Sequence, residues 1–239
     1  MKSSSIALVL AFALQVSSHT FVRAVDTVPP DSVPPTTTIQ QTTTTLKVQT
    51  TLTAKDIVKV SRIQTNKPVV FITIDDGATV SDQLAKVLDK NHVAVTTFAM
   101  PEMLWRARKW YRARQNMTFE NHTNTHAHMT TISPRNQKIE LCWANKLIKQ
   151  IVGQRPVLYR PPRGSWSEEN RAAMAKCGLK YAVLWSVVIE NTVPEKLEFH
   201  RGDIILFHYV QSLPTVLPEI LKILKKQKLE PALLRDYLK

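Results

Sequence analysis

The sequence predicts an α/β fold in which helices cover a parallel β-sheet. Short apolar runs rich in β-branched residues alternate with segments of helical periodicity from about residue 57 onward. Pro68 to Ile74 is almost continuously apolar, which is typical of a strand buried on both faces of a parallel sheet. Repeated alternation of this kind indicates a sheet that is either closed as a barrel or open.

The expected elements follow one another in regular order. Leu84, Val87 and Leu88 have the spacing of one helix face. Ser133-Pro134 is a favourable helix start, and Gly178 is a favourable helix stop. The patterns predict strands at 68–74, 93–99, 117–120, 156–159, 181–185 and 203–208, and helices at 79–91, 102–114, 135–152, 168–176 and 217–226.

The beginning of the chain differs in composition from the rest. Lys2 precedes the apolar run Ile6 to Val16, which is too short to span a bilayer, and Val22-Arg23-Ala24 offers a loose cleavage site. This pattern predicts a signal peptide at 1–24, with an uncleaved anchor as the alternative. Threonine and proline dominate 25–56, which predicts a disordered linker before a folded domain at 57–239.

The formal net charge of +13 favours polyanionic partners. Export argues against nucleic acid and favours a secreted or cell-wall-associated protein acting on a surface polymer, without stable membrane insertion. One basic cluster in the expected helix at 102–114 fits a solvated face or a polymer-binding patch; it comprises Arg106, Arg108, Lys109, Arg112 and Arg114. Cys142 and Cys177 fit either one disulfide or two buried thiols.

Polar side chains occur where the expected strands end. Asp75 and Asp76 follow the first strand, and His122, Arg160 and His208 lie at the ends of three others. In parallel βα folds the carboxyl ends of the strands meet at one face, and working residues gather there. These five residues therefore define one candidate site.

The residue types indicate metal chemistry at that site. Asp75 and Asp76 are adjacent, so one carboxylate can bind a metal ion while the other handles a proton. His122 and His126 are four residues apart, which predicts two imidazoles on one side of a helical turn. One aspartate and two histidines leave coordination positions open, as a catalytic zinc site requires. His128 is expected at the surface.

Five motifs together carry a family resemblance. The chain resembles the polysaccharide deacetylase family, also called the NodB-homology domain or carbohydrate esterase family 4, over about residues 63–239. The resemblance rests on motifs that occur in the family's order: Thr73-Ile74-Asp75-Asp76-Gly77, His122-Thr123-Asn124-Thr125-His126, Arg160-Pro161-Pro162-Arg163-Gly164, Trp185, and Leu206-Phe207-His208.

The resemblance implies a distorted (β/α) barrel of the NodB-homology type and hydrolysis of N-acetyl groups on chitin-like or peptidoglycan glycans. It implies a divalent metal, zinc in the first place with cobalt or nickel as alternatives. The implied roles are Asp75 as base, His208 as acid, Arg160 as the residue that positions Asp75, Trp185 and Leu206 as walls of the acetyl pocket, and Asp76, His122 and His126 as metal ligands.

Three positions depart from the family pattern. Ser186 follows Trp185 where an aspartate usually supports the motif arginine, so weaker support for Arg160 is expected. Arg163 stands where an aromatic residue is usual, which adds charge to the substrate-binding groove, and Tyr209 stands where aspartate is frequent. No departure removes a proposed ligand, acid or base, so a divergent but active enzyme is expected.

Two alternatives keep the same fold. One is a glycan-binding protein without turnover, and the other is a hydrolase of a different amide or ester in an acidic wall polymer. Asn116-Met117-Thr118 and Asn121-His122-Thr123 match the N-glycosylation pattern, but both are interpreted as coincidental because Asn121 adjoins a proposed ligand.

Overall fold

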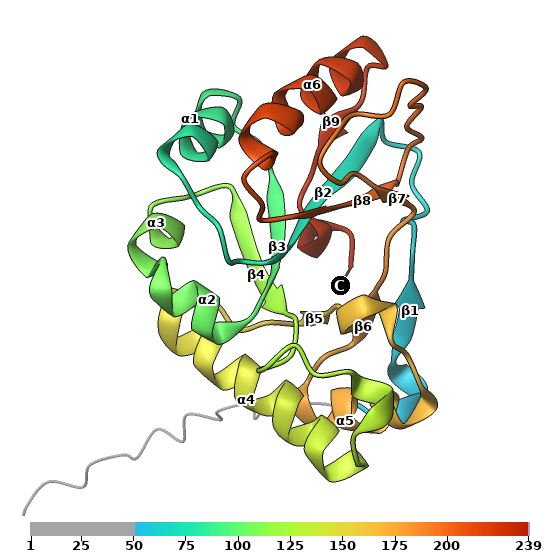
Figure 1. Ribbon diagram of the computed structural model, residues 1–239. Helices are drawn as coiled ribbons and strands as arrows, with labels where there is room; N and C mark the ends of the chain where they lie inside the picture. Colours follow the sequence, from blue (N-terminus) through green and yellow to red (C-terminus); the bar gives the residue numbers. More distant parts are fainter. Residues whose placement is uncertain (1–50, 239) are drawn as a thin grey trace, which may run out of the picture. The chain divides into compact units, whose positions relative to one another are not determined.

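The computed structural model describes residues 51–238 (Figure 1). The expected signal peptide and most of the expected linker lie outside the described residues. The strands are β1 (Val58–Val60), β2 (Val69–Asp76), β3 (Val95–Ala99), β4 (Met117–Asn121), β5 (Leu158–Tyr159), β6 (Tyr181–Val183), β7 (Val187–Val188), β8 (Ile204–His208) and β9 (Glu230–Pro231). The α-helices are α1 (Asp82–Lys90), α2 (Pro101–Arg106), α3 (Arg108–Arg112), α4 (Pro134–Val152), α5 (Glu168–Cys177) and α6 (Leu213–Lys226).

The strands form one curled parallel sheet in the order β1-β6-β5-β4-β3-β2-β8-β7, with β9 added beside β2. The segment after β1 approaches the start of β8, which is the second-last strand of this order. An antiparallel bridge joins Arg62 and Asp203, whose side chains form an ion pair of 2.7 Å. The sheet is therefore an incomplete barrel, which agrees with the expected distorted (β/α) barrel.

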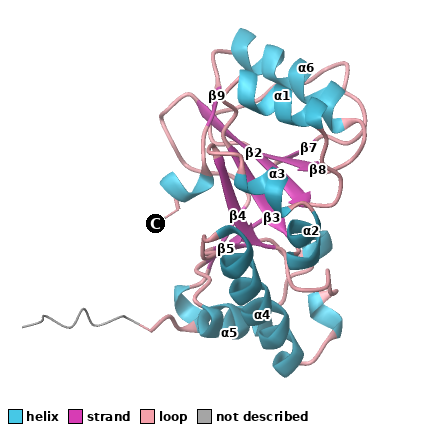
Figure 2. Ribbon diagram, turned by 90° about the vertical axis from the view of Figure 1, so that its left-hand side faces the viewer, coloured by secondary structure: helices cyan, strands magenta, loops and turns pink. Residues whose placement is uncertain are grey.

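The helices cover the outside of the sheet in two groups. Figures 1 and 2 show α1 beside α6 at one end of the molecule, and α4 beside α5 at the other. Cys142 on α4 and Cys177 on α5 form a disulfide, which decides between the two possibilities left open by the sequence. Within the described range no helix is both long and apolar enough to cross a bilayer.

Local sequence signals set several helix boundaries. The Ser133 hydroxyl accepts a hydrogen bond from the Asn136 N–H at the start of α4, and Gly178 ends α5 at φ 73°. Several predicted bounds were imprecise. The expected helix at 102–114 is divided at Ala107 into α2 and α3, the strand from Tyr181 ends at Val183, and α6 begins at Leu213. The helix expected at 79–91 begins only at Asp82, and the strand expected at 156–159 begins only at Leu158. The short strands β1, β7 and β9 were not predicted.

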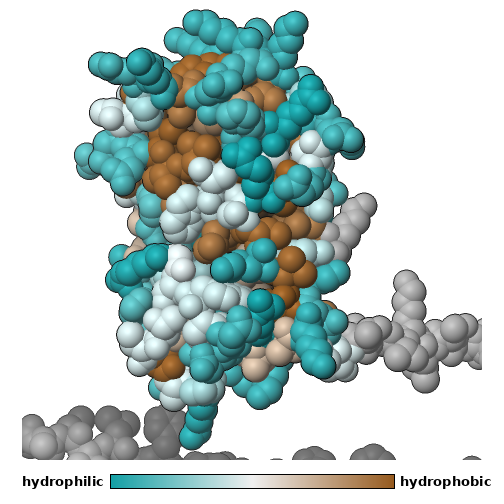
Figure 3. All heavy atoms as spheres, turned by 90° about the vertical axis from the view of Figure 1, so that its right-hand side faces the viewer, coloured by the Kyte–Doolittle hydropathy of each residue, from teal (hydrophilic) through white to brown (hydrophobic). Residues whose placement is uncertain are grey.

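The buried core lies on both faces of the sheet. Val70, Ile72 and Ile74 on β2 are fully buried on one side, and Phe71 is fully buried on the other, as the continuous apolar run predicts. The end strands are more open. Val58 on β1 and Val188 on β7 are exposed, and Figure 3 shows apolar atoms interrupting the polar surface on that side of the molecule. Buried polar side chains occur at the carboxyl rim, where the strands end, and include Asp75, His122 and Arg160.

Candidate active site

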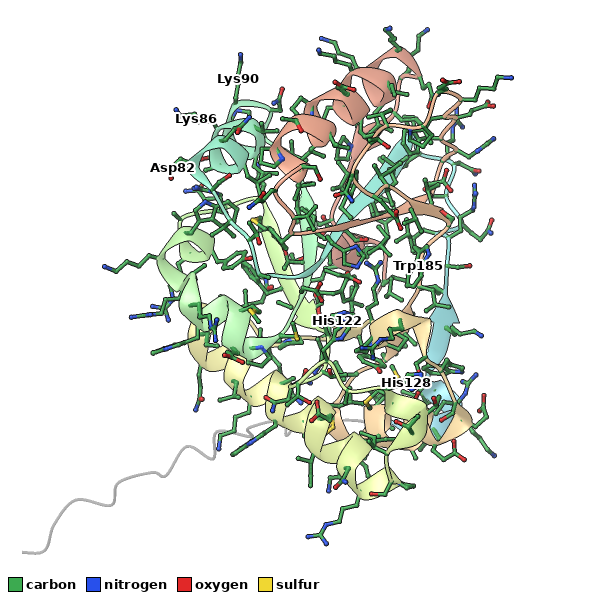
Figure 4. All side chains as sticks on the ribbon, in the orientation of Figure 1. Asp82, Lys86, Lys90, His122, His128 and Trp185 are labelled. Carbon is green, nitrogen blue, oxygen red and sulfur yellow. A yellow bond between two sulfur atoms is a disulfide. The ribbon has the colours of Figure 1, made fainter. Side chains whose placement is uncertain are left out.

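Strand pairing brings the predicted site residues to one rim of the sheet. Asp75 on β2 is the register partner of His208 on β8, and Asn121 on β4, which precedes His122, is paired with Tyr159, which precedes Arg160. Figure 4 shows His122 near the centre of the view, where the strands end. The exposed side chain of His128 lies outside the cluster, as expected.

Asp76, His122 and His126 form a compact cluster of possible metal ligands. One donor atom from each residue lies within 4.8 Å of the other two. The Asp76 Oδ1 atom is 3.6 Å from Nε2 of both histidines. This oxygen is buried and has no hydrogen-bond partner among the described residues. A buried acceptor without a donor is costly, so the arrangement fits a cation held between these three atoms.

A hydrogen bond to the backbone of Arg160 fixes the orientation of the His122 ring. Its Nδ1 lies 2.9 Å from the Arg160 carbonyl oxygen. Because a carbonyl can only accept, Nδ1 carries the proton and donates, which leaves the Nε2 lone pair directed toward Asp76. Backbone carbonyls behind ligating histidines commonly set this tautomer.

The loop from His122 to His126 is not a helical turn, so that prediction was wrong. Thr123 and His126 adopt left-handed conformations with φ of 66° and 59°. The Asn121 side-chain oxygen accepts from the Thr123 N–H, and the Glu140 carboxylate accepts from the N–H groups of the next two residues. These bonds hold the strained loop, which brings the two imidazoles together without helical geometry.

Backbone strain is concentrated at the site. Six non-glycine residues in the described part of the chain have positive φ, and four of them belong to the site loops: Asp76, Thr123, His126 and Arg163. A conformation of this kind costs about 1–3 kcal/mol per residue and persists only where surrounding contacts impose it. The concentration of strained residues in these loops supports a functional site without reference to the sequence motifs.

Asp75 is buried and held by one guanidinium. Its side chain is 4% exposed, and its Oδ1 accepts a hydrogen bond of 2.7 Å from Arg160 Nη1. The other oxygen, Oδ2, lies 3.8 Å from His122 Nε2 and has no hydrogen-bond donor among the described residues. Asp75 therefore keeps one free carboxylate oxygen beside the ligand cluster.

The expected weakening of the support for Arg160 is not found. This fully buried side chain donates to the Thr73 hydroxyl at 2.7 Å and to the carbonyls of Val183 and Leu184. The Phe98 ring lies 4.2 Å from the guanidinium carbon. Burial lowers the pKa of Arg160, and the Asp75 carboxylate offsets part of that effect. Threonine, two carbonyls and an aromatic ring thus satisfy the guanidinium where Ser186 replaces an acid.

The possible metal ligand His126 is biased toward its neutral form. Burial first, and the neighbouring His122 second, lower the pKa of His126. The positive charge of Arg163 acts in the same direction. Since a metal binds the neutral imidazole, these effects favour coordination.

The remaining predicted residues line the same rim. Leu206 is buried opposite Thr73, and His208 is half-buried at the end of the same strand. Trp185 is half-buried, lies 5.8 Å from the Arg160 guanidinium and packs so closely against Gly164 that an added Cβ would meet it at 3.3 Å. Arg163 is exposed at the edge of the site. Asn121 is fully buried, which agrees with the interpretation of its sequon as coincidental.

Two buried tyrosines under the site were missed by the sequence reasoning. The Tyr111 hydroxyl donates to the Gly77 carbonyl at 2.9 Å, and the Tyr209 hydroxyl bonds to Thr97 at 2.7 Å. Burial raises the pKa of both tyrosines, so they remain protonated donors. Tyr209 was noticed only as a departure from a motif, and Tyr111 lay in a segment interpreted as a charged surface helix.

Fold and site together define a class of protein: a parallel half-barrel with an Asp-His-His cluster that could hold a metal ion, and a second, arginine-paired aspartate at its carboxyl rim. The family model described as polysaccharide deacetylase matches residues 62–182, half of the chain. The chain belongs to the polysaccharide deacetylase family.

Individual relatives are distant. An uncharacterized protein from Geobacillus stearothermophilus is 30% identical over 180 residues, which cover 68% of each chain. An uncharacterized protein from Streptomyces coelicolor is 28% identical over 151 residues, and a chitooligosaccharide deacetylase from Rhizobium leguminosarum bv. phaseoli is 30% identical over 129 residues. The matches cover 60% and 52% of this chain, and 58% and 56% of those two relatives.

Solved structures share the fold. A family 4 carbohydrate esterase from Bacillus anthracis superposes with a TM-score of 0.63 at 22% identity, covering 77% of this chain and 89% of the other. A second protein from that organism, described as a family 4 pseudoenzyme, superposes with a TM-score of 0.64 at 21% identity, covering 76% and 69%.

Proposed function

We propose that the protein is a metal-dependent hydrolase that removes N-acetyl groups from a cell-wall or chitin-like polysaccharide. The observation that carries the proposal is the convergence of Asp76, His122 and His126 within 4.8 Å, beside an Asp75 carboxylate held by Arg160. Family membership and the chitooligosaccharide deacetylase among the relatives support a glycan amide as the target. The predicted export signal supports a substrate outside the cell.

The ligand cluster would hold a divalent cation, zinc in the first place. Such an ion would act as a Lewis acid and would lower the pKa of coordinated water to about 7. The oxygen donor and two imidazole donors fit zinc, and cobalt and nickel accept the same donors.

The residues around that cluster divide the proton transfers between them. Arg160 donates to Oδ1 of Asp75 and so leaves Oδ2 free. Oδ2 accepts a proton from the attacking water. His208, on the neighbouring strand, donates a proton to the departing amine. Leu206 and Trp185 supply apolar walls for the acetyl methyl group, and Arg163 adds a positive charge at the entrance.

Acetate release tests the function directly. Protein loaded with zinc should release acetate from N-acetylglucosamine oligomers, and chelator should abolish the release until zinc is restored. Asp75→Asn should remove activity while the protein still binds zinc, because the ligand cluster is intact. Absence of acetate from chitin oligomers and from peptidoglycan with wild-type protein, or full activity in Asp75→Asn, would contradict the proposal.

Two other functions predict different results in the same assay. A glycan-binding protein without turnover would bind zinc and oligomers but release no acetate. A family 4 pseudoenzyme has a similar fold, so this outcome is included in the test. A hydrolase of another amide or ester would show its activity on an acidic wall polymer instead, which the charge of +13 would favour.

A further inference from the structure

A hollow of about 480 Å³ lies between helices α2 and α4, outside the ligand cluster. Its volume falls in the range of roughly 300–1,000 Å³ that is typical of ligand pockets. The lining combines apolar side chains with groups that form hydrogen bonds; it includes Trp105, Leu147, Glu102, Gln150, Asn124 and Thr125. A flat aromatic surface together with scattered polar groups suits a sugar ring, which presents C–H groups on its faces and hydroxyls around its edge.

Two walls of the hollow belong to chain segments that lead into the candidate active site. Asn124 and Thr125 lie between the two histidine ligands, and their N–H groups donate to Glu140 on α4 at 2.9 Å. On the other wall, α2 begins immediately after Met100, whose N–H donates to the Asp76 carbonyl at 3.2 Å. A chain occupying the hollow would therefore contact the same backbone segments that carry the metal ligands.

Trp105 is the most exposed of the large apolar side chains in the described structure, at 55%. The Arg108 guanidinium lies 4.2 Å from the centre of its ring, and Trp105 also lines the hollow. Exposed tryptophans beside an open pocket commonly mark binding sites. Figure 2 shows α2 and α4 neighbouring each other on the side of the molecule where this hollow lies.

Trp143 provides a natural comparison within the chain. It is 48% exposed on α4, and Lys146, three residues later, lies 4.6 Å from its ring, just as Arg108 lies three residues after Trp105. Trp143 does not line the hollow. If exposed tryptophans and their neighbouring cations bound a membrane surface, both Trp105 and Trp143 would take part. A ligand in the hollow would contact only Trp105.

We propose that the hollow between α2 and α4 is a subsite for sugar residues of a β-1,4-linked N-acetylhexosamine chain, namely residues that lie two or more positions along the chain from the one that is deacetylated, with Trp105 as its stacking platform. The inference rests on the proposed function for the identity of the polymer. It assigns to Trp105 a role in binding long substrates and none in the chemical step.

The test compares Trp105→Ala with Trp143→Ala on chitohexaose and chitobiose. Acetate release by the zinc-loaded full chain is expected to show a KM about tenfold higher for chitohexaose in Trp105→Ala, with kcat little changed. Chitobiose, too short to reach the hollow while its acetyl group is at the ligands, should be hydrolysed equally by both variants and by wild type. Trp143→Ala should behave as wild type on both substrates.

A binding measurement separates this inference from the proposed function. In the zinc-loaded Asp75→Asn background, calorimetry should show that Trp105→Ala weakens chitohexaose binding about tenfold, and that Trp143→Ala does not. This result would support the subsite even if wild-type protein released no acetate. Unchanged chitohexaose binding in Trp105→Ala, no chitohexaose binding by the parent protein, or equal losses in both tryptophan variants would overturn it. A loss confined to binding of phosphatidylglycerol vesicles would overturn it in favour of a membrane contact.

Discussion

Replacing Thr73 by valine tests whether a strand hydroxyl supports the motif arginine, Arg160. The Thr73 side chain is fully buried, accepts from Arg160 Nη1 at 2.7 Å and donates to the Ile205 carbonyl at 2.7 Å. Valine has nearly the same shape but no hydroxyl, so Thr73→Val removes both bonds without opening a cavity. Arg160 keeps its bonds to Asp75, Val183 and Leu184 and remains in the protein interior.

The magnitude follows from the kind of bond that is lost. A hydrogen bond to a charged group contributes about 1.5–3 kcal/mol. The bond to the Ile205 carbonyl adds about 0.5–1.5 kcal/mol, so Thr73→Val should lower the free energy of unfolding by about 2–4.5 kcal/mol, which a domain of ordinary stability, about 5–15 kcal/mol, tolerates. If the lost bond to Arg160 costs about the same 1.5–3 kcal/mol in the transition state, because Arg160 no longer aligns Asp75, kcat/KM falls about 10- to 100-fold.

The assay measures kcat/KM on chitin oligomers and urea unfolding for wild type, Thr73→Val and Thr118→Val. Thr118 on β4 is also buried, and its hydroxyl bonds to Thr96 at 3.3 Å, away from Arg160. The control should lose stability and keep its rate. Equal rates for Thr73→Val and wild type would refute the idea that Thr73 supports the arginine, and equal rate losses in both variants would assign the effect to stability alone.

Three further predictions concern the site and its frame. Replacing both Cys142 and Cys177 by alanine should lower the unfolding free energy by roughly 4 kcal/mol, because the bridge closes a sequence separation of 35 residues; urea unfolding measures the change, and an unchanged midpoint would contradict it. Tyr111→Phe removes the donor to the Gly77 carbonyl and should weaken zinc affinity about tenfold, measured by competition with a chelating dye; an unaltered affinity would show that this bond does not hold the Asp75-Asp76-Gly77 turn. In metal-free protein, the lowered pKa of His126 means that the unfolded chain takes up its proton first, so stability should fall as the pH drops through 6.5 and level off below the folded pKa; His126→Asn should lessen this dependence, and an identical pH profile would argue against it.

The βα alternation and the rim of the site followed from the sequence because both depend on local patterns. The run from Pro68 to Ile74 predicted β2, the strand at the centre of the β3-β2-β8 group, and register with β8 then placed Asp75 opposite His208. Parallel pairing of strands requires their carboxyl ends to coincide, so residues far apart in sequence could be assigned to one face. The short strands were beyond this reasoning, since two or three residues carry no periodicity.

Features that depend on packing between distant segments could not be predicted from local sequence patterns. The spacing of His122 and His126 suggested a helical turn, but bonds from Asn121 and Glu140 impose a strained loop instead. The support of Arg160 was expected from the residue after Trp185, whereas it comes from Thr73 across the sheet. Sequence spacing identified which side chains converge, and only the tertiary contacts showed how each is held.

Zinc titration by calorimetry tests the central claim most directly, because every proposed step depends on a cation held by Asp76, His122 and His126. Metal-free wild type should bind one zinc ion per chain with high affinity, and Asp76→Asn should lose most of that affinity while remaining folded. Wild-type protein that takes up no zinc, cobalt or nickel, or an Asp76→Asn variant that binds as well as wild type, would contradict the account.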